Sequence, residues 1–138
     1  MATMTRSAAQ TTGTTRDVLT TTLLVFGVWL ATAALVRVVH VAVDPLSPAG
    51  GAVVTMIAIV CAAWVYMRLS RHAGVEHALG VGIAWLALTI LAEMLMTSRL
   101  GHGWYVLLGS PAHPLLRNLN FFLWIFATAA FARRESTS

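Results

Sequence analysis

The chain has 138 residues, of which 58% are hydrophobic and only 10% charged, and its mean hydropathy is +0.78. Soluble domains carry about 25% charged residues, so this composition excludes an ordinary soluble protein. The formal net charge is +4, and the nine basic residues are all arginines, placed singly or in pairs near the ends of apolar runs. Such a distribution is typical of membrane topology, and it does not form the basic patch of a nucleic-acid-binding protein.

The N-terminal part of the chain predicts a polar tail followed by a membrane span. Residues 1–16 are rich in threonine, serine and alanine, and we expect them to be disordered. The apolar run at about residues 18–43 is too long for the core of a signal peptide, and no clear cleavage site follows it. We therefore expect a permanent span, which ends at residues 44–48 because two prolines interrupt the helix there.

Three further apolar runs are predicted to span the membrane, at about residues 51–69, 78–98 and 115–132. Each has close to the roughly 20 residues that a helix needs to cross a hydrocarbon core. Residues 99–114, between the last two runs, are too polar and too rich in glycine and proline to span. We expect the centre of this piece to lie in the membrane interface, with His102, Trp104 and Tyr105 as its interfacial residues.

The arginines predict the topology of the chain. Six of them lie in the N-terminal tail, around the linker after the second span, or at the C-terminus, and three lie on the other side. By the positive-inside rule, both termini are expected in the cytoplasm. The predicted fold is an all-α transmembrane four-helix bundle at residues 17–134, with a short interfacial segment between helices 3 and 4 and a cytoplasmic tail at residues 135–138.

Glu93 lies inside the third apolar run, where an ionisable side chain is costly and usually faces protein or water. At 1.5 Å per residue, Arg37, Glu93 and Arg117 all fall within roughly 10 Å of the outer membrane boundary. Small and hydroxyl-bearing residues share the helix faces of Arg37 and Glu93, as close helix packing in membranes requires. An arginine beside a carboxylate favours its charged form and a bidentate pair. We therefore predict a cluster of these three side chains.

Two interpretations of this cluster remain open. In the first, which we prefer, Arg37, Glu93 and Arg117 form a structural clamp that fixes the order of the helices. In the second, His40 lies nearby and the two arginines outnumber the glutamate, so the site is net positive. A net positive site would bind an anionic group, such as a lipid headgroup, a carboxylate or an acidic side chain of a partner.

No cofactor, metal ion or catalytic site is predicted. The five histidines lie at different membrane depths, and none of the His and Cys spacings typical of zinc or c-type haem sites occurs. The sequence also lacks a glycine-rich phosphate loop, a nucleophile elbow and paired catalytic carboxylates. We therefore expect a protein that is not an enzyme.

Several motifs resemble those of a family of small bacterial inner-membrane proteins with four spans. The W-x-x-L-T-x-x-x-E pattern of that family matches Trp85–Glu93, and its G-x-x-W-x-x-L-L pattern matches Gly101–Leu108. Arg117 and Arg37 correspond to arginines in its last and first helices, although Val38 stands where the family often has an acid. The first two spans match only by hydropathy. The resemblance implies a four-helix membrane fold and carries no particular activity.

The expected function is that of a small accessory or scaffold subunit in the bacterial inner membrane. It would bind a membrane lipid, another membrane protein or a second copy of itself through the predicted arginine and glutamate cluster, and it would not bind nucleic acid. One alternative is an oligomeric small transporter or channel for an anionic solute, although no broken helix marks a transport site. A second alternative is a haem- or quinone-binding redox subunit, which the unequal depths of the histidines disfavour.

Overall fold

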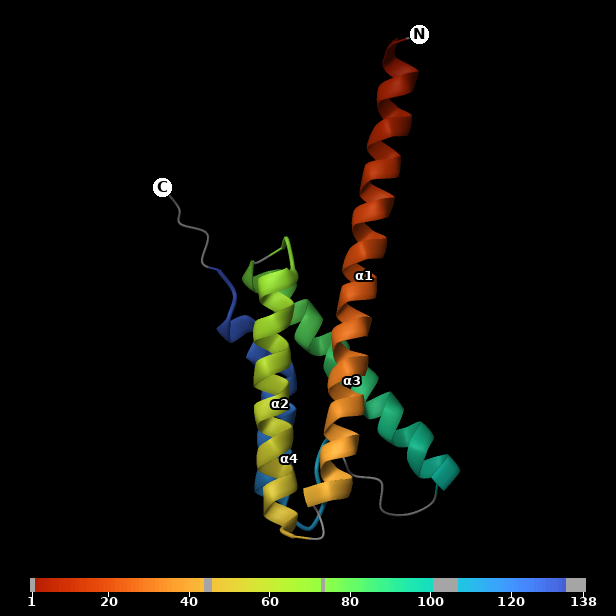
Figure 1. Cartoon of the computed structure of the whole chain (residues 1–138). Helices are drawn as coiled ribbons and strands as arrows, with labels where there is room; N and C mark the ends of the chain where they lie inside the picture. The colour runs from red at the N-terminus through yellow and green to blue at the C-terminus, as the bar shows by residue number, and fades with distance from the viewer. Residues whose placement is uncertain (1, 44–45, 73, 101–106, 134–138) are drawn as a thin grey trace.

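The computed structural model describes residues 2–43, 46–72, 74–100 and 107–133, except the side chains of residues 2–12 and of residue 48. Over this part of the chain, helices are the only regular secondary structure (Figure 1). The helices are α1 (Ala2–Val43), α2 (Pro48–Leu69), α3 (Val75–Leu100) and α4 (Pro114–Ala130). The all-helical fold predicted from the apolar runs is confirmed.

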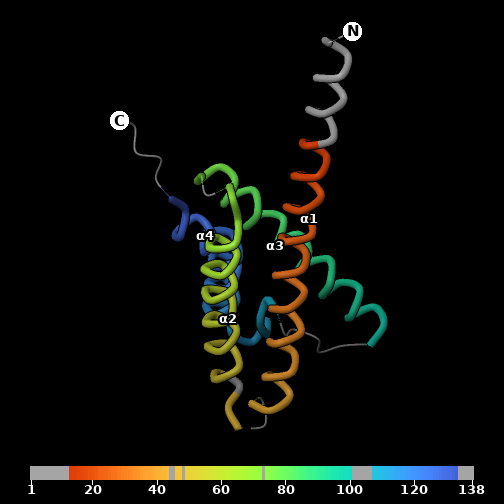
Figure 2. Tube along the Cα trace, turned by 45° about the horizontal axis from the view of Figure 1, so that its top comes forward, coloured from red at the N-terminus to blue at the C-terminus, as the bar shows by residue number. Residues whose placement is uncertain are grey.

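The helices do not form a regular parallel bundle. α2 packs against both α1 and α4, and α4 packs against α3, whereas α1 and α3 share only a small contact. α3 runs obliquely to the other three helices, and its C-terminal end lies apart from them (Figures 1 and 2). We call the end with the α2–α3 loop the upper end and the end with the α1–α2 loop the lower end, as in Figure 1.

The helix boundaries follow from local capping signals. α2 begins where the Ser47 side chain accepts a hydrogen bond from the Gly50 N–H at 3.2 Å, with proline in the first turn of the helix. A proline is tolerated there because the first N–H groups of a helix have no partner within the helix. α2 ends at Leu69, and the N–H of its C-terminal capping residue Ser70 still donates to the Tyr66 carbonyl at 2.8 Å. Short loops join α1 to α2 and α2 to α3.

α1 starts much earlier than the sequence predicts, because it is helical from Ala2 through the residues expected to be a disordered tail. These residues contain one glycine, Gly13, and no proline, so nothing interrupts a helix that continues from the apolar run. With 42 residues the helix is about 63 Å long, which exceeds the roughly 40–45 Å thickness of a bilayer. Its N-terminal part therefore extends beyond the upper end of α2 (Figure 1).

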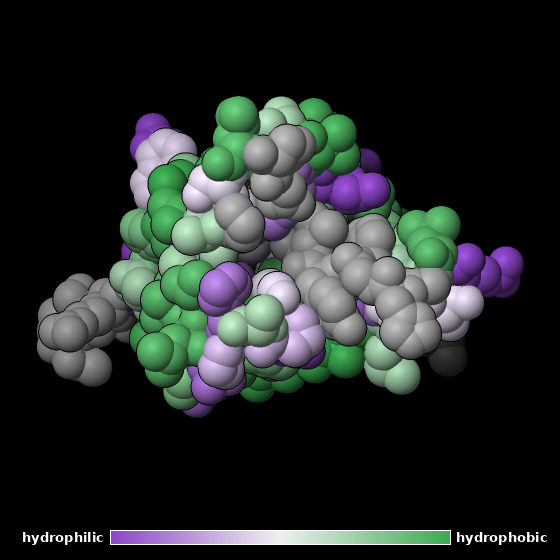
Figure 3. Space-filling model, turned by 90° about the horizontal axis from the view of Figure 1, so that it is seen from below, coloured by the Kyte–Doolittle hydropathy of each residue, from purple (hydrophilic) through white to green (hydrophobic). Residues whose placement is uncertain are grey.

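Three helices are long and apolar enough to cross a membrane, at Gly13–Val43, Ala49–Leu69 and Val75–Leu100. α4 has 17 residues, somewhat fewer than the roughly 20 that span a hydrocarbon core. Large apolar side chains are exposed on all four helices, as expected for a surface that faces lipid. Seen from the lower end, hydrophobic residues occupy much of the visible periphery (Figure 3).

The core lies where α2, α3 and α4 meet. The fully buried ring of Trp85 makes edge contacts with Tyr66 and Trp124, with ring centroids 5.6 Å and 6.2 Å apart. α3 and α4 approach so closely that a Cβ atom at Gly82 would collide with the Ile125 carbonyl. Such close contact of backbones through a small residue is a common way for helices to associate in membranes. This packing joins the upper half of α3 to the C-terminal half of α4.

Candidate functional site

Glu93 is buried on α3, with 7% of its surface exposed, and its carboxylate faces the segment that precedes α4. The carboxylate oxygen accepts a hydrogen bond of 2.7 Å from the backbone N–H of Leu108. Leu107 and Leu108 are 1% and 2% exposed, so they are inserted into the bundle and do not lie at its surface. These two residues of the segment expected in the membrane interface are thus packed within the protein. The partner of Glu93 is a backbone amide that the sequence did not suggest.

Three side chains from α3 and α4 satisfy the non-helical backbone at Leu107 and Leu108. In addition to the Glu93 contact, the Trp124 indole N–H donates to the Leu107 carbonyl at 3.2 Å. The Asn120 amide donates to the Leu108 carbonyl at 3.4 Å. Non-helical backbone at membrane depth must find its hydrogen bonds within the protein, because the hydrocarbon offers none. We call Glu93, Asn120 and Trp124 the backbone clamp.

Arg117, in the first turn of α4, lies beside Glu93 on the wall of an open cavity of about 490 Å³. The arginine charge interacts electrostatically with Glu93. Its guanidinium carbon also lies 5.9 Å from the ring centroid of Phe121, within the range of a cation–π contact. The cavity is mainly apolar, and we call it the lower cavity. Its lining comprises Ile90, Glu93, Met94, Thr97, Ser98, Leu108, Arg117 and Phe121.

The structure brings together two of the four predicted site residues, Glu93 and Arg117, and places the other two elsewhere. His40 is buried between α1 and α2, where its Nε2 atom lies 2.8 Å from the Thr55 hydroxyl oxygen. Arg37 is exposed on α1, and within the described residues no contact joins it to Glu93 or Arg117. The physical reason is that α1 packs mainly on α2, whereas α3 leaves the bundle toward the lower end (Figure 1).

The remaining predicted site residues, His102, Trp104 and Tyr105, lie outside the described residues. Asn120 and Trp124, which belong to the backbone clamp, were not among the predicted site residues. The signal was present, because both lie on the Arg117 face of α4 and an asparagine in an apolar run needs a hydrogen-bond partner. The identity of that partner depends on how the loop folds back, which no periodicity reveals.

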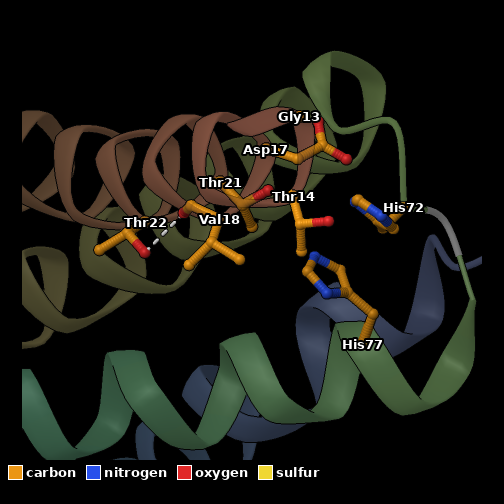
Figure 4. A pocket seen from close by; sticks show the side chains of 8 residues that line it. All are labelled: Gly13, Thr14, Asp17, Val18, Thr21, Thr22, His72 and His77. Carbon is orange, nitrogen blue, oxygen red and sulfur yellow. Dashed lines mark hydrogen bonds between the residues drawn. The ribbon is translucent and has the colours of Figure 1, made fainter. Parts of the chain in front are cut away.

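A second hollow lies at the upper end, between α1 and the α2–α3 loop, and we call it the upper cleft. It consists of two adjoining cavities of about 700 Å³ and 460 Å³. Both cavities are lined by Asp17 on α1 and His72 in the loop. Figure 4 shows the Asp17 carboxylate pointing toward this loop and the His77 ring reaching from α3 toward α1. The Tyr66 hydroxyl lies 2.8 Å from the His77 Nε2 atom and fixes that ring from below.

Neither hollow has the chemistry of a metal centre. Within the described part of the chain, no group of three or more His, Cys, Asp or Glu side chains is placed to hold an ion. In the upper cleft, His72 and His77 lie close together, with ring centroids 5.4 Å apart, but Asp17 does not complete a ligand set with them.

Comparison with protein families, with curated proteins and with solved structures finds no match for this chain. The resemblance to small bacterial inner-membrane proteins with four spans therefore rests on the quoted motifs alone.

Proposed function

We propose that the protein is a non-catalytic accessory or scaffold subunit of the bacterial inner membrane that binds a transmembrane helix of a partner protein at the lower cavity. In this proposal all four helices span the membrane and both termini lie in the cytoplasm. The arginines near the upper end support this orientation by the positive-inside rule.

The observation that carries the proposal is the divergence of α3 from its own bundle. Its lower half exposes large apolar side chains, including Leu91, Met94 and Leu95, and its C-terminal end lies apart from the other helices (Figures 1 and 2). Methionine is flexible and polarisable, so its side chain adapts to an irregular partner surface. A partner helix in the space beside α3 would contact this apolar surface over several turns.

The chemistry of the lower cavity agrees with such a partner. The carboxylate of Glu93 is already engaged by the Leu108 N–H, which argues for a structural role and against a catalytic one. Arg117 supplies a positive charge to a wall that is otherwise mostly apolar. We expect the partner helix to place an acidic or carbonyl group near Arg117, because a polar interaction inside a membrane is made between helices.

Site-specific cross-linking tests this proposal. A photoreactive residue at Met94 is expected to capture one membrane protein in a purified complex of defined stoichiometry. The same residue at Ile83, which is exposed on the upper half of the same helix, is the matched control and should not capture it. Arg117→Gln is expected to weaken the complex, and Arg99→Gln, at the exposed end of α3, is expected to leave it intact.

Other outcomes of this experiment would reject the proposal. Capture of lipid alone at Met94 would make the lower cavity a lipid site. Capture of a second copy of the chain would instead favour the homo-oligomer on which the transporter alternative depends. Equal capture from Met94 and Ile83 would show that the lower cavity provides no specific contact.

A further inference from the structure

Three charged side chains, two positive and one negative, line the upper cleft. Arg16 and Asp17 are neighbours on α1, and Arg71 lies opposite them in the α2–α3 loop. All three are exposed, so a ligand can reach them from water. Among the residues that the structure describes, Asp17 makes no ion pair with either arginine. Two guanidinium groups and one carboxylate therefore line one cavity.

The positions of these charges divide the upper cleft into two parts. Both arginines line the smaller cavity of about 460 Å³, and neither lines the larger one of about 700 Å³. Asp17 belongs to both cavities, and the larger one continues to the rings of His72 and His77. A ligand that fits both parts would therefore place an anionic group beside the arginines and a cationic group at Asp17.

Apolar side chains also line the upper cleft, namely Val18 and Leu24 on α1 and Leu69 on α2. These residues belong to the helices that are long and apolar enough to cross a membrane. The upper cleft therefore lies where the protein passes from the hydrocarbon to the polar headgroup region. A ligand that combines a charged headgroup with an acyl chain matches this change of environment.

We propose that the upper cleft binds the phosphoethanolamine headgroup of a membrane lipid. Arg16 and Arg71 face the phosphate, because a guanidinium group pairs with phosphate oxygens through two parallel hydrogen bonds. Asp17 faces the ammonium group, whose three N–H donors match a carboxylate. A choline headgroup carries the same charges but has no N–H to donate, so the site distinguishes a primary amine from a trimethylated one. This assignment is independent of the partner proposed for the lower cavity.

Native mass spectrometry of the full chain in mild detergent tests this assignment. The protein is titrated separately with phosphatidylethanolamine, phosphatidylcholine and phosphatidylglycerol of the same acyl composition. We expect phosphatidylethanolamine to bind about tenfold more tightly than phosphatidylcholine, as for one charge-assisted hydrogen bond. Asp17→Asn should remove this preference, whereas Arg71→Gln should weaken the binding of every phospholipid.

Matched controls separate the upper cleft from its surroundings. Glu76→Gln removes a carboxylate in the first turn of α3, and Arg68→Gln removes an arginine in the last turn of α2. Both residues lie at the same end of the molecule, and neither lines the upper cleft. Both variants should retain the preference of the unaltered protein for phosphatidylethanolamine. Thermal unfolding of each variant reports whether the fold is kept.

Further measurements decide whether the ligand is a lipid. Free O-phosphoethanolamine that displaces the lipid at equal concentration would support the headgroup assignment and identify a soluble source. Displacement only by the intact lipid would support a membrane source. Equal affinity for phosphatidylethanolamine and phosphatidylcholine in the unaltered protein would overturn the proposal. An equal loss of preference in Asp17→Asn and Glu76→Gln would overturn it as well.

Discussion

Replacement of Glu93 by alanine should destabilise the protein, because the buried N–H of Leu108 would lose its hydrogen-bond acceptor. The carboxylate of Glu93 accepts the Leu108 N–H at 2.7 Å, and Leu108 is 2% exposed. An unsatisfied buried donor costs about 1–3 kcal/mol. Leu108 is almost fully buried, so water has little access to the freed amide. We expect the free energy of unfolding of Glu93→Ala to fall by about 1–3 kcal/mol from this contact.

Glu93→Gln is the informative companion, because glutamine keeps a side-chain carbonyl at the same distance along the chain. A neutral hydrogen bond contributes about 1 kcal/mol, so this variant should lose less stability than the alanine variant. Glu76→Ala is the matched control: the residue belongs to the same helix but is exposed in its first turn. Its stability should stay within about 0.5 kcal/mol of that of the unaltered protein.

Reversible unfolding in mixed micelles measures these differences, and hydrogen exchange at the Leu108 amide identifies their origin. Exchange at Leu108 should accelerate in Glu93→Ala more than in Glu93→Gln, while amides in the upper half of α3 stay protected. If the exchange rate of Leu108 is the same in all three proteins, Glu93 does not hold this amide. The account of the backbone clamp would then be wrong, even if the alanine variant were less stable.

Two further predictions concern helix packing. Gly82→Ala should reduce the thermal stability strongly, because its methyl group would collide with the Ile125 carbonyl, whereas Gly80→Ala on the open side of α3 should cost nothing; equal melting temperatures for the two variants would contradict the packing of α3 on α4. A double-mutant cycle with His40→Ala and Thr55→Ala should give a coupling energy of about 0.5–1.5 kcal/mol, because their side-chain atoms lie 2.8 Å apart in a buried position; additive effects would show that this contact between α1 and α2 contributes nothing.

Much of the fold could be predicted from the sequence, because the hydrophobic pattern determines where the helices lie. The apolar runs at 51–69, 78–98 and 115–132 correspond to α2, α3 and α4 within a few residues at each end. The early start of α1 was not predicted, since a polar composition says little about helix formation when no proline or glycine cluster interrupts the chain. The oblique course of α3 and its close approach to α4 at Gly82 could not be predicted, because periodicity does not give the neighbours of a helix.

The candidate site was predicted only in part, for a related reason. The rise per residue gives the depth of a side chain, so Glu93 and Arg117 were expected at the same level, and both line the lower cavity. It does not give the neighbours of a helix, and Arg37 lies on α1, which makes only a small contact with α3. Leu107 and Leu108 were expected in a short segment at the membrane interface, because the piece between the last two apolar runs is too polar to span. Their burial follows from the partners on α3 and α4, which become visible only in three dimensions.

The backbone clamp also has a consequence for how the protein is made. Glu93 reaches the membrane within α3 before the Leu108 amide and α4 have emerged from the ribosome. A lone acidic side chain at the centre of a membrane helix raises the free energy of insertion by about 2.5–3.5 kcal/mol, and one nearer the boundary, such as Glu93, raises it by less. Once α4 follows, the carboxylate gains its amide and the neighbouring Arg117 charge. In the four-span topology proposed above, insertion of α3 and α4 as one helical hairpin would avoid a step that α3 alone would find unfavourable.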